Sequence, residues 1–196
     1  MTTYLGNFLL SLSLFFAISQ FFVSKKNKFK FITITVNGLL VSSLLSFGLL
    51  MYSHIISDFS IVNVFQNSHT TKPLFYKISG VWGNHEGSML LWALILAGYG
   101  AAVAAFGKNL RPALKVRILG VQALIGTGIL AFILLTSNPF LRLTPAPING
   151  NGLNPLLQDP GLAFHPPLLY LGYVGLSLTF SFAVAALIEG WVGAAW

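Results

Sequence analysis

The chain has 196 residues, of which 55% are hydrophobic and only 8% are charged, with a formal net charge of +7. Soluble domains carry about 25% charged residues, so this composition excludes an ordinary soluble protein. The sequence contains no cysteine, which excludes a disulfide, a thiolate metal site and a catalytic thiol within this chain.

Five apolar segments are long enough to cross a bilayer, which takes about 20 helical residues. They predict an all-α, polytopic membrane protein with about five transmembrane helices and two long outer-face loops. We expect a single membrane domain over residues 1–196 that is part of a larger helical bundle. The first segment is too long for the core of a signal peptide, so we expect it to be retained. The predicted spans are residues 4–23, 31–56, 88–106, 118–135 and 168–188.

Basic residues gather in two of the connections between these spans. By the positive-inside rule, both connections lie in the cytoplasm or the matrix. The two long connections, residues 57–87 and 136–167, then face the outer side, as does the N-terminus. The net charge is explained by this topology and by contact with lipid headgroups, so we do not expect nucleic-acid binding. The basic residues are Lys25, Lys26, Lys28 and Lys30 in the first connection and Lys108, Arg111, Lys115 and Arg117 in the third.

The end of the first long connection holds several residues that can carry chemistry. Asn84 is placed to cap the third span, and Glu86 in its first turn favours the helix dipole. Trp82 anchors the chain at the membrane interface, packs between helices or, together with His85, orders a site on the outer face. The His85-Glu86 pair is not a zinc-protease motif, because Met89 stands where a second histidine is required.

The second long connection ends at a histidine that a metal or a haem iron can reach. Its prolines and Asn-Gly steps predict turns and extended backbone, while its leucines and Phe164 argue against disorder. Pro166 and Pro167 suit only the first turn of the fifth span. Because the residue before a proline favours extended backbone, we expect the His165 imidazole to project away from that helix at the water–lipid boundary.

Three stretches of the chain resemble the N-terminal region of the CcmF family, the haem lyase component of the cytochrome c maturation system. The most specific is Asn-Pro-Leu-Leu-Gln-Asp-Pro-Gly at residues 154–161, followed by Phe-His-Pro-Pro-Leu-Leu-Tyr at residues 164–170. Residues 82–92 and 136–140 carry the rest of the resemblance. The sibling haem lyases for nitrite reductase share much of this pattern.

The resemblance implies that His165 is one axial ligand to haem on the outer face, while haem passes from a chaperone to the apocytochrome. With haem in this place, Arg142 can pair with a haem propionate, and Asp159 can accept a hydrogen bond from the other ring nitrogen of the imidazole. The alternatives are that Arg142 is a solvated loop charge and that Asp159 caps its own turn.

The same resemblance implies partners: the remaining CcmF fragments, the haem chaperone CcmE, a CcmH-type protein that presents apocytochrome c, apocytochrome c itself and membrane lipid. Further spans, a second outer histidine and the haem b ligands of the family are not in this chain. We therefore expect one piece of a split mitochondrial version, inactive alone, in the mitochondrial inner membrane. The alternative location is the bacterial inner membrane.

Two other functions stay open. A haem transporter subunit needs ionisable residues inside its spans, and the predicted spans are almost free of them. A structural membrane subunit that holds a maturation or respiratory complex together fits the sequence better than a transporter does.

Overall fold

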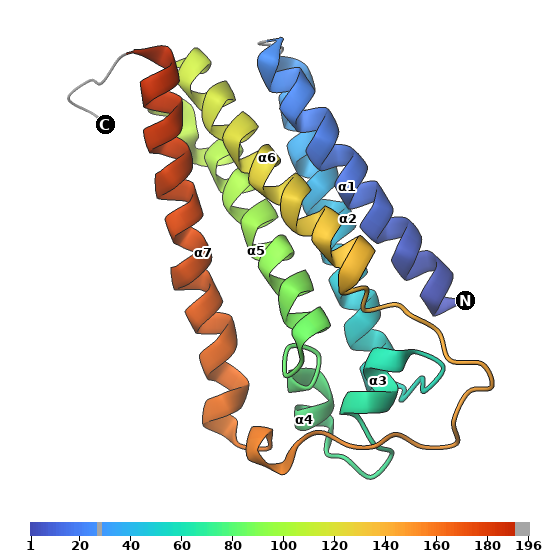
Figure 1. Ribbon diagram of the computed structural model, residues 1–196. Coiled ribbons are helices and arrows are strands. Elements are labelled where there is room, and N and C mark those ends of the chain that lie inside the picture. The colour runs from blue at the N-terminus through green and yellow to red at the C-terminus, as the bar shows by residue number, and fades with distance from the viewer. Residues whose placement is uncertain (27–28, 191–196) are drawn as a thin grey trace.

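The computed structural model describes residues 1–26 and 29–190, and nearly all of its regular structure is helical (Figure 1). Within these residues, five helices are long and apolar enough to cross a membrane, which confirms the predicted number. Their length follows from uninterrupted apolar sequence, since a bilayer core takes about 20 helical residues. They are α1 (Thr2–Lys25), α2 (Phe29–Ile55), α5 (His85–Phe106), α6 (Pro112–Thr136) and α7 (Pro160–Glu189).

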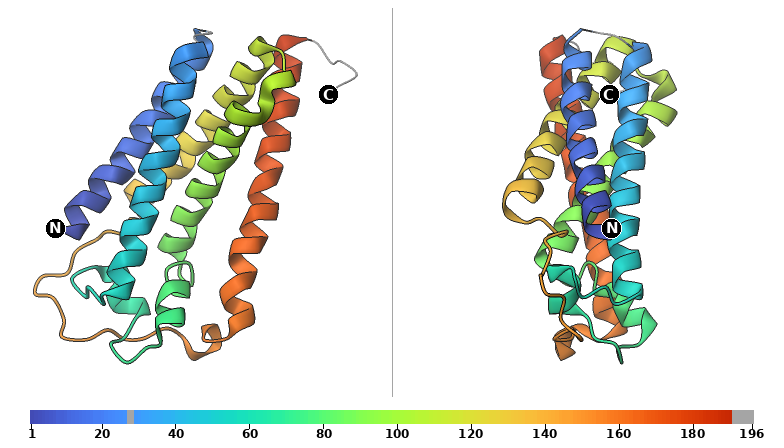
Figure 2. Two further views of the ribbon diagram at one scale, coloured as in Figure 1. Left: turned by 180° about the vertical axis from the view of Figure 1, so that it is seen from behind. Right: turned by 90° about the vertical axis from the view of Figure 1, so that its right-hand side faces the viewer.

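The five long helices run side by side and alternate in direction along the chain (Figures 1 and 2). Helix α1 packs against α2 and α6, α2 also packs against α5, and α7 packs against α5 and α6. Helices α1 and α7 consequently form opposite edges of the bundle. The N-terminus and both long connections meet at one end, which is the lower end in Figure 1. This is the arrangement that the predicted topology requires, and we call it the loop end.

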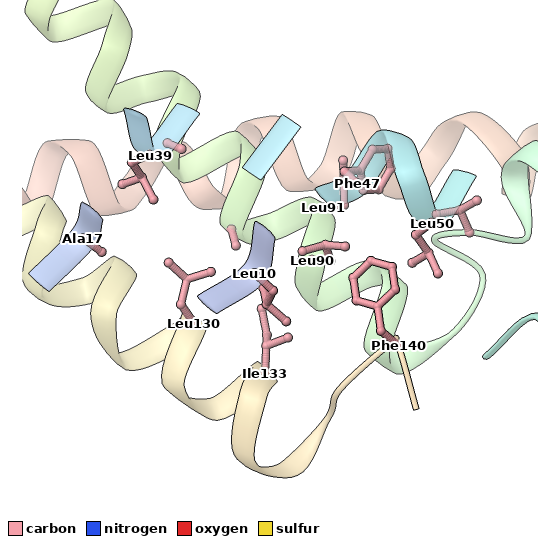
Figure 3. Close-up of a cluster of buried hydrophobic side chains, with 13 residues drawn as sticks. Leu10, Ala17, Leu39, Phe47, Leu50, Leu90, Leu91, Leu130, Ile133 and Phe140 are labelled. Atoms are coloured by element: carbon pink, nitrogen blue, oxygen red, sulfur yellow. The ribbon is translucent and has the colours of Figure 1, made fainter. Parts of the chain in front are cut away.

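The hydrophobic core near the loop end is built from side chains of four helices and from one ring of the second long connection (Figure 3). That ring belongs to Phe140, which is fully buried. It lies directly on α1, so that a Cβ atom at Gly6 would overlap it. Nearby, Asn138 donates a hydrogen bond to the side chain of Asn7 at 2.7 Å. The second connection is therefore fixed to α1 where it leaves α6.

Both long connections contain short helices, although only turns and extended backbone were predicted for the second one. An isolated antiparallel bridge between Ile61 and Arg142 joins the two connections to each other. The backbone N–H of Val62 donates to the carbonyl of Leu141 at 2.9 Å beside it. The short elements are α3 (Val62–Asn67), α4 (Leu74–Ser79) and the 3-10 turn η2 (Pro155–Leu157) at the loop end, and the 3-10 turn η1 (Gly107–Asn109) at the other end.

Helix α7 begins at Pro160 and not near residue 168. Its start has two strong signals. Asp159 accepts a hydrogen bond from the N–H two residues later, at 2.8 Å, and Pro160 at the first helical position lacks an N–H that would have no acceptor within the helix. The prolines at positions 166 and 167 consequently lie inside the helix. His165 is helical, so the prediction of extended backbone at this residue was wrong.

Candidate functional site

Buried polar side chains fix the start of α5. Asn84 caps this helix as predicted, because its Oδ1 accepts a hydrogen bond from the N–H of Gly87 at 2.8 Å. Asn63 of α3 donates to Asn84 Oδ1 at 2.7 Å and to a Glu86 carboxylate oxygen at 3.3 Å. The Nε2 atom of His54 lies 3.0 Å from Asn63 Oδ1. We call His54, Asn63, Asn84 and Glu86 the polar cluster.

His54 has a structural place in this cluster. Its side chain is fully buried, although the sequence placed it only near the outer end of the second span. Buried polar groups need hydrogen-bond partners, and the imidazole finds one in Asn63. The contact ties the end of α2 to α3, so His54 does not present its ring to the outer surface.

His85 is exposed and joins the start of α5 to the end of α6. Its Nε2 atom lies 3.0 Å from the hydroxyl oxygen of Ser137. Its ring also meets the Phe132 ring edge-on, with centroids 6.3 Å apart. Both contacts help to fix the structure at the start of α5, and the predicted ordering of an outer-face site by His85 stays a prediction.

A cavity of about 330 Å³ lies between the start of α5, the second long connection and α7. Trp82 forms part of its wall, and the indole Nε1 of Trp82 donates a hydrogen bond to the carbonyl of Ala163 on α7 at 2.9 Å. The cavity mixes polar and apolar surface, so it suits an amphipathic ligand. Its lining residues are Ser79, Trp82, Gly83, Asn84, His85, Ser88, Leu153, Leu157 and Pro166.

His165 is exposed on α7, and the next residue, Pro166, belongs to the cavity wall, whereas His165 itself does not line the cavity. The ring of Phe164 packs near the Phe75 ring of α4, with centroids 5.9 Å apart. In the part of the chain that the structure describes, no three His, Asp or Glu residues are grouped to hold a metal ion. Haem iron needs only axial ligands from protein, because the porphyrin supplies the others. A single exposed histidine is therefore compatible with axial ligation of haem.

The two charged residues that were expected near His165 make different contacts in the structure. Asp159 accepts the hydrogen bond from the Gly161 N–H at 2.8 Å, which is the turn-capping alternative. The guanidinium carbon of Arg142 lies 6.0 Å from the centre of the Tyr4 ring on α1. Because α1 and α7 form opposite edges of the bundle (Figure 2), the structure does not bring Arg142 to His165.

Lys72 is a loop-end residue that the sequence did not single out. Its side chain is only 8% exposed, and its Nζ donates to the carbonyl of Asn67 at 2.9 Å. Burial, assisted by the nearby positive charge of Lys77, lowers the pKa of Lys72 to about 8. Asn67 donates in turn to the carbonyl of Asn63 at 2.9 Å. Lys72 thereby extends the polar cluster, through contacts that no local sequence pattern predicts.

The chain matches a known protein family and several individual proteins. The sequence model of a family described as "Cytochrome C assembly protein" matches residues 82–191. The chain is 66% identical over 152 residues to the cytochrome c-type biogenesis protein ccl1 of Rhodobacter capsulatus, covering 78% of this chain and 23% of that protein. It is 44% identical over 200 residues to the cytochrome c-type biogenesis protein CcmF of Haemophilus influenzae, covering 98% of this chain and 31% of that protein.

Two further matches bear on the fold and on the branch of the family. A solved structure described as "Cytochrome c Heme Lyase CcmF" superposes with a TM-score of 0.83 and 26% identity, covering 96% of this chain and 31% of that one. The cytochrome c-type biogenesis protein NrfE of Haemophilus influenzae is 42% identical over 168 residues, covering 80% of this chain and 26% of that protein. The chain thus spans about a quarter to a third of the length of these relatives.

Proposed function

Because the chain belongs to the cytochrome c assembly protein family, we propose that it acts in cytochrome c maturation as the N-terminal part of a haem lyase. In this role His165 is an axial ligand to haem at the outer membrane face, while haem moves from a haem chaperone to apocytochrome c. The observation that supports the role most strongly is that His165 is exposed near the start of α7, directly before a residue that lines the cavity.

The loop end fits haem as a passing substrate. Haem is a flat apolar ring with two charged propionates and an iron that accepts imidazole nitrogen. The side chains of Leu153 and Leu157 offer apolar surface in the cavity that Pro166 also lines, and His165, the residue before Pro166, is exposed. The haem supplies the vinyl groups that react with the apocytochrome, whereas the protein holds and orients the ring.

The work of this chain is to present a ligand. A neutral imidazole binds iron through one ring nitrogen, and a helical backbone limits the directions in which the His165 side chain can point. His85 and Trp82 order the site from α5 and the segment before it. The roles of Asp159 as a hydrogen-bond partner of the imidazole and of Arg142 as a propionate contact remain predictions. A propionate at Arg142 requires a haem position that reaches toward α1.

Partners and location follow from the same proposal. The relatives are three to four times longer than this chain, since it covers 23% to 31% of their length. We propose that the remaining haem lyase portion, a chaperone of the CcmE type, a CcmH-type protein and apocytochrome c complete the assembly, and that this chain is inactive alone. The proposed location is the mitochondrial inner membrane, with the bacterial inner membrane as the alternative because the relatives named above are bacterial.

The proposed ligand role is tested by His165→Ala in cells that depend on this chain for cytochrome c assembly. We expect holocytochrome c to fall to background while the variant stays in the membrane, and we expect added imidazole to restore part of the transfer. His69→Ala is the matched control, because it removes another histidine of the loop end, and it should be silent. Normal holocytochrome c in His165→Ala would refute the ligand role.

A structural role is the second candidate function. It is favoured by α7, where only 22% of the most apolar window is buried inside this chain. Its exposed side chains can pack against other membrane helices, so the chain could serve chiefly to hold partners together. Normal holocytochrome c in His165→Ala, combined with loss of a larger complex when the exposed face of α7 is altered, would favour this alternative. The exposed face includes Leu168, Leu171, Tyr173, Leu176 and Phe180.

The proposed orientation is tested with single cysteines, for which the cysteine-free chain is a ready background. Ile148 is 99% exposed at the loop end, and Lys26 is exposed at the other end. A membrane-impermeant thiol reagent should label Ile148→Cys from the outer side and Lys26→Cys from the inner side. Gly150 is unsuitable for this test, because any Cβ there would overlap the carbonyl of Ser68. The opposite labelling pattern would place His165 on the inner side of the membrane and contradict the proposal.

A further inference from the structure

Pro167 removes a backbone hydrogen-bond donor from the second turn of α7. In an α-helix the carbonyl of residue i accepts from the N–H of residue i+4, so the carbonyl of Ala163 would be bonded by residue 167. Proline has no N–H. Ala163 is only 3% exposed, so water has little access to this carbonyl. A buried carbonyl needs a donor, and the helix cannot supply the usual one.

Trp82 supplies that donor. Its indole Nε1, which can only donate, lies 2.9 Å from the Ala163 carbonyl oxygen. The two residues are 81 positions apart, so the tertiary structure brings a side-chain N–H to the place where the helix lacks a backbone N–H. The backbone of Trp82 is held separately from its indole. It lies in a turn that follows α4, where the Trp82 N–H donates to the carbonyl of Ser79 at 3.3 Å.

The carbonyl that Trp82 bonds is two residues before His165. The residue between them, Phe164, is held from the same side by the ring contact with Phe75 on α4. Trp82 and Pro166 both line the cavity. The segment from α4 to α5 thus holds the turn of α7 on which the exposed imidazole stands.

We propose that Trp82 is a positioning residue for His165: its indole N–H replaces the donor that Pro167 lacks and so fixes the turn of α7 that presents the imidazole. The consequence for haem rests on the proposed function of His165, whereas the geometry does not. In this role Trp82 does not contact haem and acts only through its hydrogen bond to the backbone of α7.

The test is a double-mutant cycle that separates the hydrogen bond from the bulk of the indole. Trp82→Phe removes the N–H and keeps an aromatic ring. Pro167→Ala returns a backbone N–H at position 167, which can bond the Ala163 carbonyl as in an ordinary helix. The matched control is Trp92→Phe, because Trp92 contacts α7 through its ring, stacked on Tyr170 with centroids 6.4 Å apart.

The first readout is independent of haem. A nitroxide label is attached to His165→Cys in the chain, in membranes from cells that also express its maturation partners. Loss of one neutral hydrogen bond corresponds to about a fivefold change in an opening equilibrium, so Trp82→Phe should raise the mobile fraction of the label by about that factor. Adding Pro167→Ala should return the spectrum to that of the parent, and Trp92→Phe should leave it unchanged.

The second readout is holocytochrome c with His165 intact. Trp82→Phe should lower it, because a smaller fraction of the chain then presents the imidazole on an ordered turn, and Pro167→Ala should restore it in the double variant. Unchanged label mobility in Trp82→Phe would overturn the proposal, and so would a mobility increase that Pro167→Ala does not reverse, because the indole would then act by packing. If the mobility cycle behaves as expected while His165→Ala makes normal holocytochrome c, the positioning by Trp82 stands and the proposed ligand role fails.

Discussion

The two sides of the loop end are built in opposite ways. Near α2 and α3, the polar cluster is enclosed: His54 is fully buried and bonded to Asn63, which is itself 3% exposed. At the start of α7, His165 is exposed and stands on an edge helix. The buried His54 side chain helps to hold the fold together, whereas the His165 side chain is accessible to solvent.

The same difference extends along the helices that carry these residues. The most apolar window of α2 is 44% buried inside this chain, against 22% for α7. A helix in the middle of a bundle is held by neighbours on several sides, while an edge helix depends on a few local contacts. The exposed start of α7 can therefore bind a ligand without loss of packing, provided that contacts such as the Trp82 hydrogen bond hold it in place.

The largest effect on stability is expected for His54→Ala. The change removes a buried ring and leaves the Asn63 side chain without one partner, which should cost about 3 kcal/mol of unfolding free energy. Thermal unfolding in detergent and the steady-state level in the membrane measure it. His54→Gln, which keeps a side-chain donor, should lose less. An unchanged melting temperature in His54→Ala would show that the polar cluster does not stabilise the loop end.

A smaller effect is expected for Asn84→Ala. This variant removes the cap of α5 and the acceptor for Asn63, and loss of a helix cap costs about 1–2 kcal/mol. The matched control is Asn154→Ala. Asn154 accepts from the N–H of Leu156 at 3.0 Å in an exposed 3-10 turn, so its loss should cost less than about 0.5 kcal/mol. Equal melting temperatures for the two variants would remove the contrast between the enclosed and the exposed side.

The pH dependence of stability isolates Lys72. Burial lowers the pKa of Lys72 in the folded protein to about 8, from 10.5, so the unfolded chain binds more protons than the folded one between these values. Stability should therefore rise as pH increases from 8 to 10.5. Relative to Lys72→Met, the parent should gain about 1–2 kcal/mol over this window. Parallel melting curves for the two proteins between pH 7 and 10 would contradict the buried position.

The smallest effect on stability is expected for His165→Ala. An exposed side chain outside any buried network changes the unfolding free energy by less than about 0.5 kcal/mol. The melting temperature should match the parent, in contrast to His54→Ala. If His165→Ala destabilised the chain as much as His54→Ala does, a loss of holocytochrome c in this variant would no longer report on a ligand role.

Sequence alone determined the architecture at the level of helices and ends. Hydropathy over about 20 residues is a local property, so it placed all five spans. Alternating helix direction then sent both long connections and the N-terminus to one end. The cap at Asn84 was also readable, because an N-cap involves only residues within one turn of each other. The stretch from residue 154 to residue 170 identified the family through its unusual order of residues.

Contacts between distant residues were decided by the tertiary structure. The sequence treated Pro166 as a sign of a helix start, but α7 begins at Pro160 because Asp159 caps its first turn and because Trp82 bonds a carbonyl that Pro167 leaves without a donor. The partner of that carbonyl lies 81 residues away. No pattern within a helix can reveal such a donor, since it depends on where another segment packs.

The positions of the predicted site residues also depend on how distant segments pack. Arg142 and His165 were both placed in the second long connection, which suggested a shared site. That connection leaves α6, passes α1 at Arg142 and crosses the loop end to α7. His54 and His165 are the same residue type, and they differ in whether neighbouring segments enclose them. Sequence fixes which side chains are present at the loop end, while helix packing decides which are buried to stabilise it and which stay exposed to bind.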